Sequence, residues 1–323
     1  MAQKYAENIY PVLEGSVGKF MNLFPFSVIE VFFYVAAFIF LRDLFRAGKG
    51  KEKFSDVFSG LYLLVAVLIT LYTFFCGINL YRTPFSQEAN MGREAYSDAE
   101  LKEMLSDLEG EMAFWSEKVP RGKDGLMCLP ENIRDQAQKN MVRMGNAYAP
   151  LEGYYPKPKF LLGSWFLSCQ GLTGMYSVFT IEANVNGAMT PYNVPFTMCH
   201  ELSHLKGFML EDEANFIAFV SCRTSSDPAF RYSGAMLGWL YTAAELEKRV
   251  PGIYNTLYER LPESVRRDYA ANGAFWEKYE THIMEAAQEM NNAYLKSTGQ
   301  KGLESYDRVV DLMVQYYRQR KKR

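Results

Sequence analysis

Residues 195–222 read PFTMCHELSHLKGFMLEDEANFIAFVSC and contain the most informative motif of the chain. His200, Glu201 and His204 have the spacing HExxH. On a helix, residues four apart lie on one face, so both histidines can point a nitrogen at one ion. Glu201 lies one step round that helix, where it can reach a metal-bound water. The chain has three histidines, and two of them are in this motif, which favours a metal site over an ordinary core helix.

The third ligand distinguishes the zinc proteins that share this motif. A metzincin has a histidine six residues after the second motif histidine, but Leu210 occupies that position. The nearest carboxylates are Glu211 and Glu213. One helical turn after Glu211 comes Asn215, as in the glutamate helix of gluzincin-type peptidases, where an Asp or Asn supports a ligand histidine. We therefore predict Glu211 as the third ligand and Asn215 as the supporting residue, with Glu213 as the alternative ligand.

Zinc suits this set of ligands. Catalytic zinc is held by three protein ligands of the imidazole and carboxylate type, and its fourth position stays open for water. We expect one zinc ion per chain, bound by His200, His204 and Glu211. Gly207 lies between the two predicted helices, where a left-handed C-cap would let the second helix fold back onto the first.

Two apolar segments near the start are each long enough to cross a bilayer core of about 30 Å as a helix. Residues 24–45 are apolar apart from Glu30 until Arg42, and residues 57–80 carry no charge. We predict two transmembrane helices here, within a membrane anchor covering residues 1–85. A zincin-like domain is expected over residues 86–323. Glu30 is expected near the membrane surface, because a carboxylate facing lipid is costly.

The link between these segments is basic. Short basic loops stay in the cytoplasm, and acidic residues count for little in that rule. We therefore expect everything after residue 81 to lie outside the cytoplasm, with the lipid bilayer as a partner. The net charge of −2 gives no electrostatic case for binding nucleic acid. The basic residues of the link are Arg42, Arg46, Lys49, Lys51 and Lys53.

The remainder of the chain predicts an α+β domain that is mostly helical. Ser97 followed by Glu100 is a capping box that opens a helix. Residues 160–169 and 175–185 are expected to be extended, the second because β-branched and aromatic residues recur in MYSVFTIEANV. Zincin-like enzymes commonly place such a strand beside the zinc helix, where it pairs with the substrate backbone. The alternative is a plain structural hairpin whose polar residues face solvent. Residues 230–249 predict an amphipathic helix that is buried in the domain.

These pieces together resemble a bacterial family of unknown function whose members are membrane-anchored and carry a zinc-peptidase motif. The resemblance implies a multi-pass protein of the bacterial cell membrane with an extracytoplasmic catalytic domain. Relatives usually carry one more span before the first block. The EDEAN block is also similar to that of small gene-regulating glutamate-zincins, whose ligand lies three residues before the alanine, which favours Glu211. The blocks are IYPVLEGSVGKFMNLFPFSVIE, GINLYRTPF, FTIEANVN, PFTMCHELSHLKGF, EDEANFIAF, FRYSG and NNAYLKSTGQKGLESYDRVVDL.

The expected function is zinc-dependent hydrolysis of a peptide or protein substrate. Glu201 would act as general base toward a zinc-activated water. Arg231, Tyr232 and Tyr294 are candidates for stabilising the oxyanion or contacting substrate, because FRYSG and NNAYLK are among the family blocks. The alternative is a catalytically silent zinc-containing receptor or regulator that binds a peptide or an envelope component. A purely structural zinc is disfavoured, because such sites are closed by a fourth protein ligand.

Overall fold

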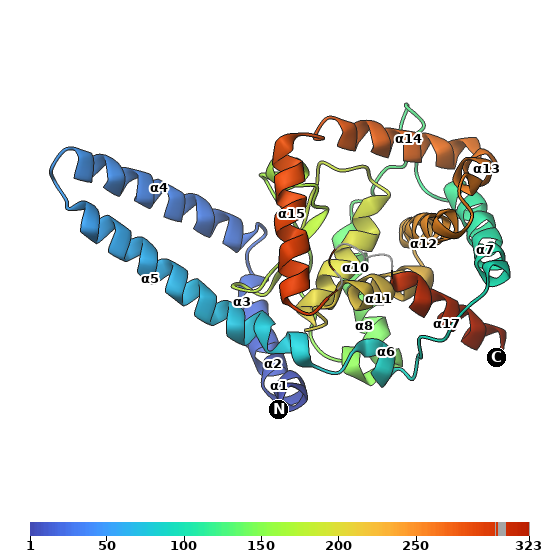
Figure 1. Ribbon diagram of the computed structural model, residues 1–323, viewed down its shortest axis with the longest axis horizontal. Helices are drawn as coiled ribbons and strands as arrows, with labels where there is room; N and C mark the ends of the chain where they lie inside the picture. The colour runs from blue at the N-terminus through green and yellow to red at the C-terminus, as the bar shows by residue number, and fades with distance from the viewer. Residues whose placement is uncertain (301, 303–307, 323) are drawn as a thin grey trace.

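The computed structural model describes residues 1–300, 302 and 308–322. It is mostly helical with one small three-stranded sheet, in agreement with the expected α+β class. A long helical hairpin projects from a rounded body, and the body holds the predicted site (Figure 1).

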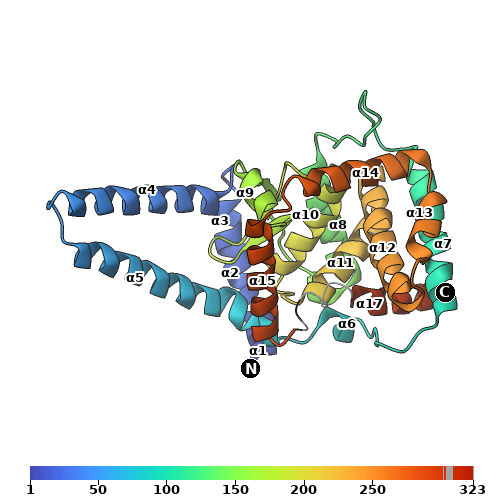
Figure 2. The same cartoon turned by 45° about the horizontal axis from the view of Figure 1, so that its top comes forward.

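The hairpin consists of two antiparallel helices that pack on each other, α4 (Val28–Gly48) and α5 (Phe54–Tyr72). Residues 49–53 join them at the tip farthest from the body, as Figures 1 and 2 show. The start of α4 and the end of α5 therefore both lie at the body. The elements flanking the hairpin are α1 (Ala2–Asn8), α2 (Tyr10–Leu13), the π-helical turn η1 (Glu14–Gly18), α3 (Lys19–Met21), the π-helical turn η2 (Thr73–Gly77) and the 3-10 turn η3 (Asn79–Tyr81).

The prediction of two membrane spans needs correction. Among the described residues one helix, Phe54–Tyr81, is long and apolar enough to cross a membrane, with a mean hydropathy of 2.3 and 6% of its most apolar window buried. Helix α4 does not meet this criterion, because it has one charged residue near its start and three near its end. Every window of 18 residues within α4 contains at least three of Glu30, Arg42, Asp43 and Arg46.

Glu30 and Glu182 attach the start of α4 to the body. The Glu30 carboxylate accepts hydrogen bonds from the backbone N–H groups of Leu162 and Gly163 at 2.9 and 2.5 Å, so it faces protein and not lipid. Glu182 accepts from the backbone N–H groups of Val28 and Ile29 at 3.1 and 3.0 Å. These N–H groups have no partner within the helix, and the helix dipole favours a carboxylate there.

A buried ion pair attaches the N-terminal segment to the turn that follows HExxH. Lys206 Nζ lies 2.8 and 3.0 Å from the two carboxylate oxygens of Glu14, and both residues are buried. Burial raises the pKa of Glu14 to about 7, although Lys206 acts in the opposite direction. Because the folded-state pKa of this acid is raised, its contribution to stability is greatest below pH about 4.5 and is lost as the pH rises to about 7.

Lys206→Met is expected to lower the free energy of unfolding at pH 8 by about 3–5 kcal/mol, because it leaves a buried carboxylate without its cation. Glu14→Gln combined with Lys206→Met should recover most of that loss, since neither residue is then charged. Urea melts of the purified variants measure both values. A double variant as unstable as the single one would show that the ion pair is not the cause.

The body is built around helices α10 (Asn193–Leu205), α11 (Glu211–Arg223) and α12 (Pro228–Arg249), which pack on one another, with α7 (Asp98–Ser116) against α12. The capping box predicted at Ser97 and Glu100 opens α7. The predicted helix over residues 230–249 is present as α12, and its apolar face is buried. The other helices are α6 (Phe85–Glu88), α8 (Ile133–Ala147), η4 (Ala149–Leu151), α9 (Ser164–Cys169), α13 (Ile253–Glu259), α14 (Glu263–Glu277), α15 (His282–Ser297) and α17 (Val309–Lys321).

The sheet differs in part from the prediction. Residues 175–185 form a hairpin, the alternative to a single strand, with β2 (Gly174–Ser177) antiparallel to β3 (Glu182–Val185). The residues of β3 are buried and do not face solvent. The strand expected over residues 160–169 is reduced to β1 (Lys159–Phe160), because Ser164–Cys169 turns into the short helix α9. The strand order β1-β3-β2 leaves β2 at an edge. This edge strand packs against α10.

Candidate metal centre

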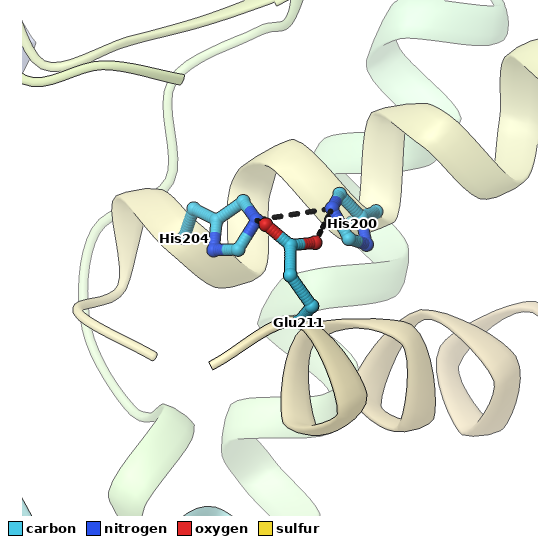
Figure 3. Close-up of side chains that lie close together, drawn as sticks. All are labelled: His200, His204 and Glu211. Atoms are coloured by element: carbon cyan, nitrogen blue, oxygen red, sulfur yellow. Dashed lines mark hydrogen bonds and ion pairs between the residues drawn. The ribbon is translucent and has the colours of Figure 1, made fainter. Parts of the chain in front are cut away.

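Two helices bring the predicted ligands together. Helix α10 carries His200 and His204 one turn apart, and α11 begins at Glu211. Gly207 adopts a left-handed φ of +91° between them, as predicted, so the chain reverses within a few residues. Figure 3 shows the three side chains pointing at one another, and all their ligand atoms lie within 4.8 Å.

The distances within the group are short. The Nε2 atoms of His200 and His204 are 3.0 Å apart. Glu211 places one carboxylate oxygen 3.3 Å from His200 Nε2 and the other 3.7 Å from His204 Nε2. Atoms bound tetrahedrally to one zinc ion at about 2.0–2.2 Å lie about 3.3 Å apart. The residues present therefore fit a zinc ion.

The ring of His204 is oriented by a backbone carbonyl. His204 Nδ1 lies 2.8 Å from the carbonyl oxygen of Phe208. A carbonyl only accepts, so Nδ1 carries the proton and donates it. In the neutral ring Nε2 then presents a lone pair toward the Glu211 carboxylate, which is unfavourable unless a cation lies between them. This is the outer partner that metal-bound histidines generally have.

The charges of the group indicate the same need for a cation. Burial lowers the pKa of His204, but the Glu211 carboxylate raises it more, to about 9. Burial also acts to raise the pKa of Glu211, and the two histidines outweigh this and hold it well below its usual range. The buried Glu211 carboxylate thus favours a positive charge beside it, which a metal ion would supply.

Glu201 lies beside the group and is buried. Burial raises the pKa of its carboxyl, while His200, His204 and the backbone N–H of Tyr176 act to lower it. Its side chain lies against Gly174 of the edge strand, where an added Cβ would come within 2.5 Å of a carboxylate oxygen. Only glycine at position 174 leaves room for this carboxylate.

The group opens into a cavity of about 700 Å³, within the size range of small-molecule and peptide sites. His200, Glu201, His204 and Glu211 all line it. The edge strand β2 forms one wall, and α15 contributes Gln288, Asn291 and Tyr294. The candidate metal centre is therefore accessible and not sealed inside the core.

The other predicted residues divide into those near the cavity and those far from it. Asn215 lines the cavity, but its side-chain oxygen accepts from the Tyr241 hydroxyl at 3.4 Å, and among the described residues its Nδ2 has no hydrogen-bond partner. Its role as the support of a histidine remains a prediction. Glu213 is held by Ser86 at 2.6 and 2.8 Å and by Arg93 at 3.2 Å, so its oxygens are already occupied.

Of the three candidates for contacting substrate, one lines the cavity and two do not. Tyr294 lines the cavity, with its hydroxyl 2.9 Å from that of Tyr72. Tyr232 is buried elsewhere and donates to Asp268 at 2.7 Å. The guanidinium of Arg231 lies over the ring of Trp115, 5.2 Å from its centre. Neither Arg231 nor Tyr232 is among the residues that line the cavity.

Sequence reasoning missed three contributors to the site, which are the Phe208 carbonyl and the side chains of Gln288 and Asn291. The Phe208 carbonyl leaves no trace in residue type, because every residue has one. Gln288 and Asn291 did leave a trace, since they and Tyr294 recur every three residues on one face of α15. That spacing of polar and aromatic residues could have indicated a wall facing a site.

Comparison with known proteins assigns the chain to a family. The model of the family described as "Protein of unknown function (DUF3810)" matches residues 5–314. The chain belongs to this family, which confirms that part of the expected resemblance. No curated protein and no solved structure matches the chain.

Proposed function

We propose that this protein is a zinc-dependent metallopeptidase of the gluzincin type, held at a bacterial membrane. The observation that carries the proposal is the convergence of His200, His204 and Glu211 in one open cavity that Glu201 also lines. A bound zinc ion would polarise a water molecule and the carbonyl group of a peptide. The reaction is hydrolysis, in which the peptide C–N bond breaks and the water oxygen forms the new bond to carbon.

Each residue has a defined part in this chemistry. His200 and His204 would hold the ion through Nε2, and the Phe208 carbonyl keeps the His204 ring in the required orientation. The Glu211 carboxylate would offset part of the charge of the ion. Glu201 takes the proton from water and delivers it to the nitrogen of the leaving amine.

The edge strand supports a peptide as the substrate. Strand β2 pairs with β3 on one side only, and its residues Gly174–Ser177 line the cavity. An extended peptide can add to such an edge through backbone hydrogen bonds, which tolerate many side chains. The peptide would then lie along α10, beside the predicted ligands.

The membrane location rests on the helix Phe54–Tyr81. The basic link at the tip of the hairpin favours the cytoplasmic side of a membrane. The body lies at the opposite end of the hairpin (Figure 1), so it would then lie outside the cytoplasm. Because both ends of the hairpin lie at the body, this topology would require α4 to cross beside the apolar helix, with its charged residues at its two ends.

Removal of zinc tests the proposal. We expect a chelator to abolish hydrolysis of a defined peptide mixture by the detergent-purified full chain, and about one equivalent of zinc to restore it. His204→Ala should be inactive with or without added zinc. His282→Ala is the matched control, because this third histidine is fully exposed on α15. Hydrolysis that survives both chelation and His204→Ala would contradict the proposal.

A further inference from the structure

The cavity at the candidate metal centre has one wall that the proposed function does not use. Ile29 and Phe33 from the start of α4 line it, and so do Tyr72 and Cys76 from the end of the apolar helix Phe54–Tyr81. The site and the helix that could cross a membrane therefore share a surface.

This wall continues into the exposed surface of the hairpin. Phe33 lines the cavity, yet 43% of it is exposed. Its neighbours Phe32 and Tyr34 are also exposed, by 39% and 55%. A soluble domain rarely leaves three consecutive aromatic side chains of a helix so open unless another apolar phase covers them. At the root of the hairpin, an apolar surface thus leads directly to the predicted ligands.

The adjoining wall of the cavity carries polar side chains and is formed by α15. In both views this helix lies between the root of the hairpin and the rest of the body (Figures 1 and 2). Its Tyr294 hydroxyl lies 2.9 Å from that of Tyr72, and Gln288 and Asn291 also line the cavity. A chain lying there would meet aromatic groups on one side and amide groups on the other. This combination suits a peptide segment in which apolar and polar residues meet.

We propose that the substrate is a membrane-anchored polypeptide, cut in the stretch where it leaves the bilayer. The proposal rests on the proposed peptidase function and names its substrate class. A chain leaving the bilayer beside the hairpin reaches the cavity at Phe33 and Tyr72 without crossing the body. An extended chain gains about 3.3 Å per residue, so cleavage should fall within about ten residues of the end of the span.

The test uses the full chain in proteoliposomes and one peptide sequence that it cleaves. This sequence is attached to a single transmembrane helix through a spacer of about 5 or about 40 residues, and it is also supplied free. Both anchored probes are present at the same concentration in the membrane. The ratio of their cleavage rates therefore reports how close to the membrane surface the cleavage site must lie. We expect the short spacer to be cleaved at least about tenfold faster than the long one.

Phe33→Ala should reduce this ratio, while Phe38→Ala is the matched control on the exposed surface of the same helix. Equal cleavage of both anchored probes would overturn the substrate class and leave the peptidase function standing. If the screen that precedes this test finds no peptide sequence that the full chain cleaves, free or anchored, the function itself is removed. If a short-chain phospholipid blocks cleavage of the free peptide in wild type but not in Phe33→Ala, the wall binds lipid and the proposal is wrong.

Discussion

Glu201→Gln is expected to lower peptide hydrolysis by at least about 10²-fold, the usual contribution of a general base. Glutamine keeps the size and polarity of the side chain, so packing against Gly174 is preserved. Glu201 is not one of the three grouped ligand residues, so zinc content should stay near one ion per chain. The change therefore isolates proton transfer from metal binding and from folding.

The measurement compares initial rates and zinc content in parallel preparations. Glu263→Gln serves as the control, because this glutamate is exposed on α14 and lies outside the cavity. Equal hydrolysis by wild type and Glu201→Gln would mean that the activity comes from another residue or a contaminant. If neither protein cleaves and both bind peptides equally well, the alternative of a silent zinc-containing receptor would replace the peptidase.

The local parts of the site were predictable from sequence because each depends on neighbouring residues. The spacing of His200 and His204 places both on one face of a helix, and Gly207 supplies the left-handed turn. The same holds for the capping box at Ser97. In each case a few adjacent residues determine the geometry.

The sequence predictions were wrong where contacts with residues distant in the chain outweigh the pattern of neighbouring residues. The chain reverses between β2 and β3 at Ile181, which has a φ of +52° and none of the glycine or asparagine that usually marks such a turn. The apolar run of α4 suggested a membrane span, but α4 has charged residues near both of its ends. The carboxylate of one of them, Glu30, accepts hydrogen bonds from the backbone N–H groups of Leu162 and Gly163. Sequence pattern alone does not show that partner.

The way in which the walls of the cavity come together was unpredictable for the same reason. Phe33, Tyr72 and Gln288 are far apart in sequence and meet only because the hairpin root and α15 lie on the same side of the body. Their residue types are ordinary for an apolar helix or an exposed one. The ligands of the candidate site could thus be predicted, whereas the surface that would select its substrate could not.

Glu211→Gln is expected to weaken zinc binding by more than the roughly 10–100-fold that loss of an outer partner costs, because it removes a ligand. Zinc should then no longer raise the melting temperature. A ligand at 100 times its Kd stabilises a protein by about 2.7 kcal/mol, so wild type should show a clear shift. Competition with a chromogenic chelator measures the affinity directly.

Glu213→Gln is the matched variant, two residues along the same helix. Unlike Glu211→Gln, it is expected to lower stability and to leave zinc binding intact. Its carboxylate binds Ser86 and Arg93, so its loss should lower the melting temperature with or without zinc, and the zinc-induced shift should remain. If Glu213→Gln abolishes the shift and Glu211→Gln retains it, the ligand is Glu213. Helix α11 would then have to turn by about 200° about its axis, since each residue advances by about 100°.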